Sequence, residues 1–120
     1  MLPPPDGKNI LPILSHLGEC YKLWHGFFAR LPKPIRNTLG LKTDNIFIEC
    51  LELSFFAAYA ARQDKVVLVK RLSVKFDLLK FFLKLLWEMK ALENNKYIAL
   101  SSRLLVTGKM LGGWLKNLGQ

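Results

Sequence analysis

The sequence predicts an all-α protein, an up-down antiparallel four-helix bundle. Apolar residues recur at intervals of three and four over long stretches, strand-like alternation is scarce, and turn signals are widely spaced. Four long helices joined by short links favour this topology. At 120 residues the chain has the size of one domain. We expect the bundle to span residues 10–120, after a flexible N-terminal arm at residues 1–9.

The first helix is expected from about residue 10 to residue 30. Its apolar positions share one side, namely Leu14, Leu17, Tyr21, Trp24 and Phe28. Pro32 and Pro34 follow. They end the helix because proline lacks a backbone donor and restricts the residue before it.

The second helix is expected to begin near residue 41, after Gly40, or slightly earlier. Its buried side is predicted to comprise Ile46, Leu53, Phe56 and Ala60. Asp64 is expected to cap the third helix, which continues to about residue 91. Asn94 or Asn95 is expected to cap the fourth helix, which runs to about residue 118.

The third helix carries two apolar stripes instead of one. The first stripe is the expected core: Leu68, Leu72, Leu79, Leu83 and Leu86. The second stripe is Val67, Val74, Leu78, Phe81 and Leu85. A monomeric bundle needs one stripe per helix, and large exposed apolar patches are uncommon on monomers. We therefore expect the second stripe to contact another subunit; the alternative is a central helix that is buried all round.

The chain is strongly basic, with 18 Lys and Arg against 9 Asp and Glu and a formal net charge of +9. Such a charge favours an anionic partner, such as nucleic acid, an acidic protein surface or an anionic membrane. The candidate contact residues are Arg62, Lys70, Arg71, Lys75, Lys80, Lys84, Arg103 and Lys109. Because no base-reading motif is visible, we expect binding without strong sequence preference. A solvated lysine face is the competing interpretation.

Compartment signals indicate a cytoplasmic protein. Cys20 and Cys50 are too few for a disulfide scaffold and fit a reduced environment. The start is not a signal peptide, because Pro3, Pro4 and Pro5 interrupt it before any apolar run develops. No apolar run approaches the roughly 18 residues of a membrane span.

The sequence contains no recognisable catalytic, cofactor or metal signature, so we expect no enzymatic activity. His16 and Cys20 share a helix face, but His25 points to nearly the opposite side, which favours structural roles over a metal site. Glu49 and Glu52 lie one turn apart and are expected to pair with lysines instead of forming an acid–base pair.

The C-terminal segment "GKMLGGWLKNL", with Tyr97 and Ser101 upstream, resembles the closing helix of the accessory variability determinant (Avd) proteins of diversity-generating retroelements. The segments "YKLWHGFFARLPKPIRNTLGLKTDNIFIECLEL" and "AYAARQDK" also resemble this family, so the similarity covers about residues 21–118. Two departures are Val106-Thr107, where the family often has an acidic residue, and the N-terminal arm. A related group is the four-helix proteins of 23S rRNA intervening sequences.

The resemblance implies a homo-oligomer, a pentameric barrel with a basic surface, encoded by a bacterium or a phage. It also implies binding to the element's reverse transcriptase and to RNA or DNA during error-prone cDNA synthesis (mutagenic retrohoming), without catalytic activity of its own. The eight candidate basic residues would then contact nucleic acid or reverse transcriptase.

Two other functions stay open at this point. The chain could be a 23S rRNA intervening-sequence protein with an RNA-related or unknown role, and gene neighbourhood separates that hypothesis from the first. It could also bind anionic membranes through the third helix. We rank the membrane hypothesis last, because the apolar residues of that helix lie in two stripes and not on one broad face.

The C-terminal glycines are expected to be structural. Gly108 and Gly112 lie four residues apart on one face, where they would let another helix lie close, within the bundle or at a subunit boundary. Gly113 belongs to the same pattern. Trp114 offers a large apolar surface just beyond that contact.

Overall fold

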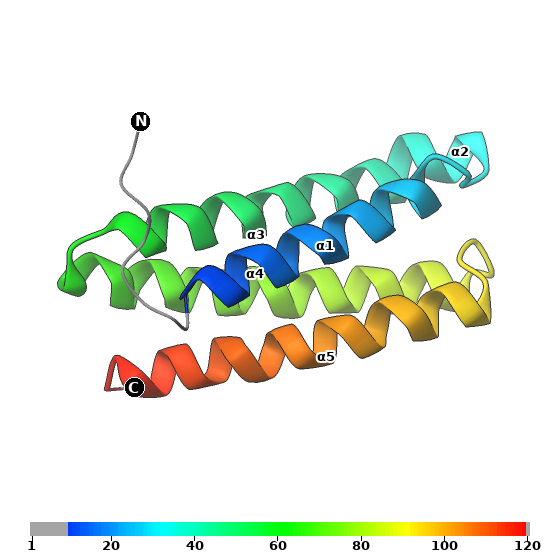
Figure 1. Ribbon diagram of the computed structural model, residues 1–120. Coiled ribbons are helices and arrows are strands. Elements are labelled where there is room, and N and C mark those ends of the chain that lie inside the picture. Colours follow the sequence, from blue (N-terminus) through cyan, green and yellow to red (C-terminus); the bar gives the residue numbers. More distant parts are fainter. Residues whose placement is uncertain (1–9, 120) are drawn as a thin grey trace.

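The computed structural model describes the backbone of residues 10–119, with side chains from residue 12, and shows four long helices side by side (Figure 1). These are α1 (Ile10–Phe28), α3 (Leu41–Tyr59), α4 (Arg62–Glu88) and α5 (Asn94–Asn117). Over this described range there is no strand. The predicted four-helix bundle is therefore confirmed, while the expected arm at residues 1–9 lies outside the described residues.

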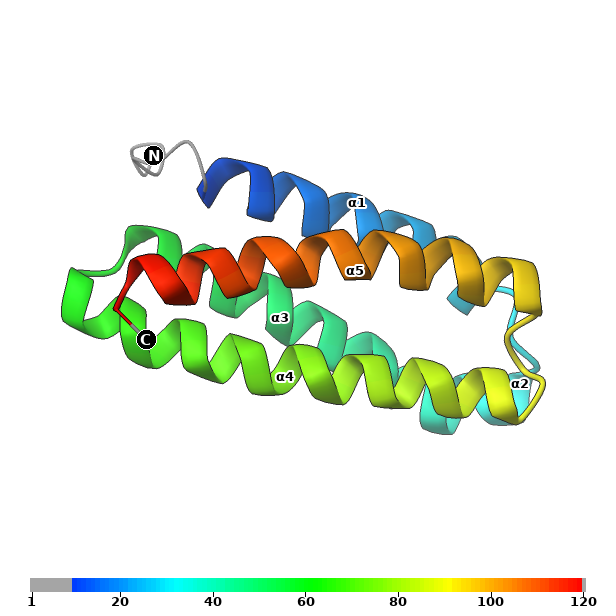
Figure 2. The same ribbon diagram turned by 90° about the horizontal axis from the view of Figure 1, so that it is seen from below.

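The four helices form a ring in which each packs against two neighbours. α1 contacts α3 and α5, and α4 contacts the same two helices. The α3–α4 link and the C-terminus lie at one end of the bundle, and the other two links lie at the opposite end (Figures 1 and 2). Consecutive helices therefore run antiparallel, as the short links require.

Two predicted caps were wrong by a few residues. The N-cap of α4 is Ala61, and Asp64 lies within the first turn, where its N–H donates to Ala61 O over 2.9 Å. The N-cap of α5 is Glu93, so Asn94 is the first helical residue. Both N-caps are extended residues without a side-chain cap hydrogen bond, and Asp64 is the acidic residue in the first turn of α4, where a negative charge is favourable.

A second difference lies ahead of α3, where a short helix α2 (Lys33–Ile35) and a π-helical turn η1 (Arg36–Gly40) lead directly into it. Gly40 is buried in this turn. A Cβ atom placed there would lie 2.9 Å from Leu31 Cδ1 and 3.1 Å from Ile35 O. The missing side chain thus lets the α1–α2 link fold back onto the start of α3.

Gly40→Ala is expected to lower the free energy of unfolding by about 1–2 kcal/mol. Overpacking costs about 1–3 kcal/mol, and the better helix propensity of alanine returns up to about 1 kcal/mol. Urea unfolding followed by circular dichroism measures the change. The control is Gly18→Ala in α1, where a Cβ meets nothing within 4 Å; this variant should be as stable as the parent or more so. Equal stability of both variants would contradict the packing account.

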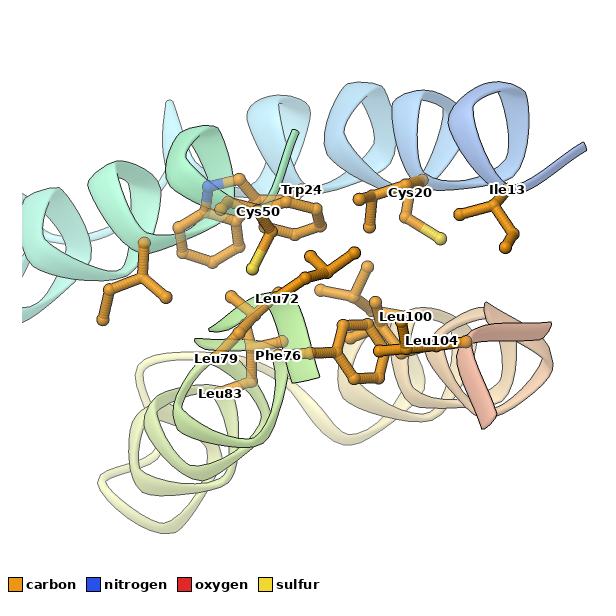
Figure 3. Close-up of a cluster of buried hydrophobic side chains, with 14 of the residues drawn as sticks. Ile13, Cys20, Trp24, Cys50, Leu72, Phe76, Leu79, Leu83, Leu100 and Leu104 are labelled. Atoms are coloured by element: carbon orange, nitrogen blue, oxygen red, sulfur yellow. The ribbon is translucent and has the colours of Figure 1, made fainter. Parts of the chain in front are cut away.

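The core lies along the bundle axis, where side chains from all four helices meet (Figure 3). Trp24 from α1 and Cys50 from α3 face Leu72 and Leu79 of α4. The predicted core stripe of α4 is confirmed: Leu72, Leu79, Leu83 and Leu86 are buried, and Leu68 is partly buried.

The predicted burial of Phe56 was wrong. Its exposed fraction is 56%, although Ile46 is buried and Leu53 and Ala60 are partly buried. The inward side of α3 is instead lined near its end by small residues, Ser54 and Ala57. Because Ser54 and Ala57 take the buried positions of this turn of α3, Phe56 lies on the exposed side of the helix.

Candidate nucleic-acid and subunit interface

The second stripe of α4 is uncovered on the single chain. The exposed fractions of Val67, Val74 and Phe81 are 50%, 70% and 58%, while Leu78 and Leu85 are partly buried. Three large apolar side chains at seven-residue spacing therefore face outward along one helix. A helix of a monomeric bundle does not need this second apolar row.

The uncovered stripe continues onto α3 through Phe56. This residue lines one hollow with Val67 and a neighbouring hollow with Val74. Its ring also lies 6.0 Å from that of Phe55. We call Phe56, Val67, Val74 and Phe81 the apolar face; the sequence pattern missed the α3 part of it by assigning Phe56 to the core.

Three of the predicted basic residues lie together with two carboxylates. Lys70, Arg71 and Lys75 line a groove of about 550 Å³ between α3 and α4, with Glu49 and Glu52 on its other wall. Lys75 Nζ lies 2.7 Å from Glu49 Oε2, which confirms the prediction that Glu49 pairs with a lysine. We call this hollow the α3/α4 groove.

Two other predicted residues line a separate hollow. Lys80 of α4 and Lys109 of α5 line a groove of about 360 Å³, the α4/α5 groove. Lys80 Nζ lies 3.4 Å from Asp77 Oδ1 in an exposed pair, and 5.2 Å from the centroid of the Phe76 ring. Exposed ion pairs of this kind contribute little to the stability of the fold, so the ammonium group of Lys80 can exchange Asp77 for another anion.

The three other predicted basic residues are dispersed. Arg62 Nη2 donates to Asn117 O over 3.4 Å, at the far end of α5. Lys84 is exposed on α4. Arg103 is exposed on α5 close enough to α1 for its charge to act on Cys20. A single chain thus places the basic residues in several locations.

Lys65 is a further basic residue of α4, and it serves the fold. Its Nζ donates to Ala57 O and to Ala58 O, over 2.9 Å each, and so satisfies carbonyls at the end of α3. Burial lowers the pKa of Lys65. The ammonium group is therefore engaged by the chain itself.

His16 and Cys20 link α1 to α5. His16 Nδ1 lies 2.7 Å from Thr107 Oγ1, which in turn donates to Arg103 O over 3.1 Å, so the imidazole nitrogen is the donor in the first bond. Cys20 Sγ lies 3.7 Å from the same hydroxyl. Burial raises the pKa of Cys20, which keeps it a thiol. In the range that the structure describes, no three potential ligands gather around a metal position.

Asp44 ties α1 to α3, and sequence reasoning missed it. Its Oδ1 accepts hydrogen bonds from Tyr21 Oη over 2.9 Å and from Trp24 Nε1 over 3.0 Å. Burial, together with the hydrogen bond and the charge of Asp44, raises the pKa of Tyr21 to about 12, so the phenol stays a donor. The signal in the sequence is that Tyr21 and Trp24, one turn apart on an apolar helix face, both need an acceptor.

The bundle does not use Gly112 and Gly113 for close helix contact. A Cβ at either position would meet nothing within 4 Å, and one at Gly108 would lie 3.4 Å from Phe76 Cε2, an ordinary contact. Close packing within the bundle, one of the two contacts expected for Gly112, is therefore not found, and a contact at a subunit boundary stays a prediction. Trp114 is buried and packs in the core.

Comparison with known proteins finds no match for this chain among protein-family models, curated proteins or solved structures. The resemblance to Avd proteins thus rests on its sequence segments alone. Every described helix is too short or too polar to cross a membrane.

Proposed function

We propose that this chain is a non-catalytic accessory protein of a diversity-generating retroelement. It is a basic oligomer, a pentamer by its resemblance to Avd proteins, that binds the reverse transcriptase and holds RNA or cDNA near it. The observation that carries the proposal is the apolar face of α3 and α4, which is left uncovered on the chain and is bordered by Lys70 and Arg71.

Oligomerisation follows from the cost of leaving this face in water. Burying apolar surface contributes about 25 cal/mol per Å², and Phe56, Val74 and Phe81 supply most of the exposed side-chain area of the face. The charges beside the face limit the ways in which two copies can meet, which favours a defined assembly over nonspecific aggregation.

Nucleic-acid binding follows from the charge repeated around such an assembly. Each copy carries a formal net charge of +9. A ring of copies would bring together basic clusters that are separate on one chain, and each phosphate contact would release condensed counterions. The phosphate backbone is common to every RNA and DNA sequence, so a scaffold of this kind serves template and cDNA alike.

The test combines light scattering with RNA binding of the purified protein over a range of salt concentrations. We expect an oligomer whose affinity falls steeply with added salt. Lys70→Glu with Lys80→Glu should retain the fold, because both side chains are exposed on the single chain, and should bind RNA at least about tenfold more weakly. Light scattering of this variant checks that it still assembles, since Lys70 borders the apolar face. The matched control is Lys22→Glu with Lys42→Glu, which reverses two exposed charges on α1 and α3; it should bind more tightly than the test variant.

A monomeric wild-type protein, or an affinity that is independent of salt, would overturn the proposal. Gene neighbourhood decides between retroelement and ribosomal roles. A reverse transcriptase gene with paired template and variable repeats nearby supports the first, and a position inside a 23S rRNA gene overturns it.

A further inference from the structure

The α4/α5 groove differs in chemistry from the other hollows that bear basic residues. Its floor is apolar, formed by the buried side chains of Leu83 and Leu104, and Lys80 and Lys109 stand on opposite helices. Tyr97 and Ser101 add two hydroxyl groups. Among the described residues that line it, none is acidic. α4 and α5 lie side by side in both views, so the groove follows their common direction (Figures 1 and 2).

The α3/α4 groove is larger but less suited to an anion. Glu49 and Glu52 oppose its three basic residues, and Glu49 already neutralises Lys75 at 2.7 Å. A phosphate placed there would face two carboxylates, and like charges repel. The lining of the α3/α4 groove beside the apolar face is therefore of mixed charge, whereas the lining of the α4/α5 groove holds no carboxylate. Asp77, outside that lining, pairs with Lys80 in an exposed ion pair.

Aromatic rings stand at one end of the α4/α5 groove. Tyr97 stacks on Trp87 with ring centroids 4.9 Å apart and an interplanar angle of 11°. Trp87 Nε1 donates to Asn94 Oδ1, which fixes the indole, while 36% of the Trp87 surface stays exposed. Proteins that bind single strands combine a basic groove with such stacking platforms.

Gly108 and Lys109 line the other end of the groove. Gly108 lies on the groove wall between Leu104 and Lys109, and no side chain projects from it. From Tyr97 to Lys109 the wall extends roughly 18 Å at about 1.5 Å per residue. This length suits a short run of nucleotides lying along the groove.

We propose that the α4/α5 groove binds a stretch of single-stranded RNA or DNA, an inference that rests on the proposed function. Lys80 and Lys109 contact phosphates, and the Trp87–Tyr97 pair stacks against a base. A duplex has its bases stacked internally and paired, so it can reach the lysines but not the aromatic pair. The groove therefore prefers single strands, while the apolar face is left for protein contacts.

The experiment measures fluorescence anisotropy of a labelled oligouridine, and of the same strand annealed to oligoadenine, at several salt concentrations. Lys80→Gln with Lys109→Gln is compared with Lys70→Gln with Arg71→Gln, which removes the same charge from the α3/α4 groove. The first variant should lower the magnitude of the logarithmic salt slope for the single strand by about 1.4, because each of the two phosphate contacts contributes about 0.7. The second should change the slope by less than half as much.

Trp87→Ala provides a second readout that does not alter charge. We expect roughly tenfold weaker binding of the single strand, the equivalent of about 1.4 kcal/mol, and little change for the duplex. Circular dichroism establishes that each variant is folded.

The outcomes separate this inference from the proposed function. Loss of binding in the α3/α4 variant but not in the α4/α5 variant would overturn the groove assignment and leave the function standing. Equal weakening of single strand and duplex by Trp87→Ala would overturn the stacking role. Absence of any salt-dependent binding by the wild-type oligomer would overturn the proposed function itself.

Discussion

Asp44→Ala is expected to lower the free energy of unfolding by about 3 kcal/mol. The substitution removes the acceptor for two donors, Trp24 Nε1 and Tyr21 Oη. Trp24 is fully buried, so its N–H cannot find water in place of the carboxylate. An unsatisfied buried donor costs about 1–3 kcal/mol, and the cavity that replaces the carboxylate adds to this cost.

Two further variants separate the loss of the hydrogen bonds from the loss of packing. Asp44→Asn keeps an oxygen acceptor in the same place, so it should lower the free energy of unfolding clearly less than Asp44→Ala does. Tyr21→Phe should lower the free energy of unfolding by about 1 kcal/mol in the parent protein. In the Asp44→Ala background it should change it by nearly nothing, because the acceptor of the Tyr21 hydroxyl is already absent there. Urea unfolding at one fixed protein concentration provides the values, since stability of an oligomer depends on concentration. If alanine and asparagine were equally costly at position 44, the acceptor role would be refuted.

The second large effect is expected at the level of assembly. Val74→Asp with Phe81→Asp should convert the proposed oligomer into monomers, because two carboxylates would have to be buried in an apolar contact. The helices should persist, since both side chains are exposed on the single chain and exposed substitutions change stability by only about 0.5 kcal/mol. Light scattering gives the mass, and circular dichroism gives the helix content.

Ile98→Asp is the control for this variant. Ile98 is a large apolar residue on α5 with an exposed fraction of 62%, similar to that of Phe81, but it is not part of the apolar face. We expect it to assemble as the parent does. Dissociation of the Ile98 variant alone would move the subunit contact from α4 to α5 and contradict the proposed interface.

The sequence was sufficient to predict the fold because the long helices carry regular apolar spacing. Leu72, Leu79, Leu83 and Leu86 recur at three, four and seven, and the structure buries all of them. The π-helical turn before α3 was missed because its shape depends on the close approach of Gly40 to Leu31 and Ile35. The spacing of apolar residues in the sequence carries no information about such a contact.

The candidate site was predictable only in part. Single-helix periodicity identified Val67, Val74 and Phe81 as a row apart from the core, and the structure leaves them exposed. It could not show that Lys75 pairs with Glu49, or that Lys80 and Lys109 line the same groove, because both arrangements involve two helices. Sequence spacing orders residues along one helix, but the rotation of neighbouring helices decides which charges meet.

The two buried cysteines can report on the transient opening of individual helices. Cys20 on α1 and Cys50 on α3 are both fully buried, and burial raises the pKa of each thiol, that of Cys50 to about 12. Because the thiolate is the reactive form, neither is poised to react while the helices are packed. Alkylation of each thiol is therefore limited by the transient opening of its own helix, so the chain can be followed helix by helix without any added label.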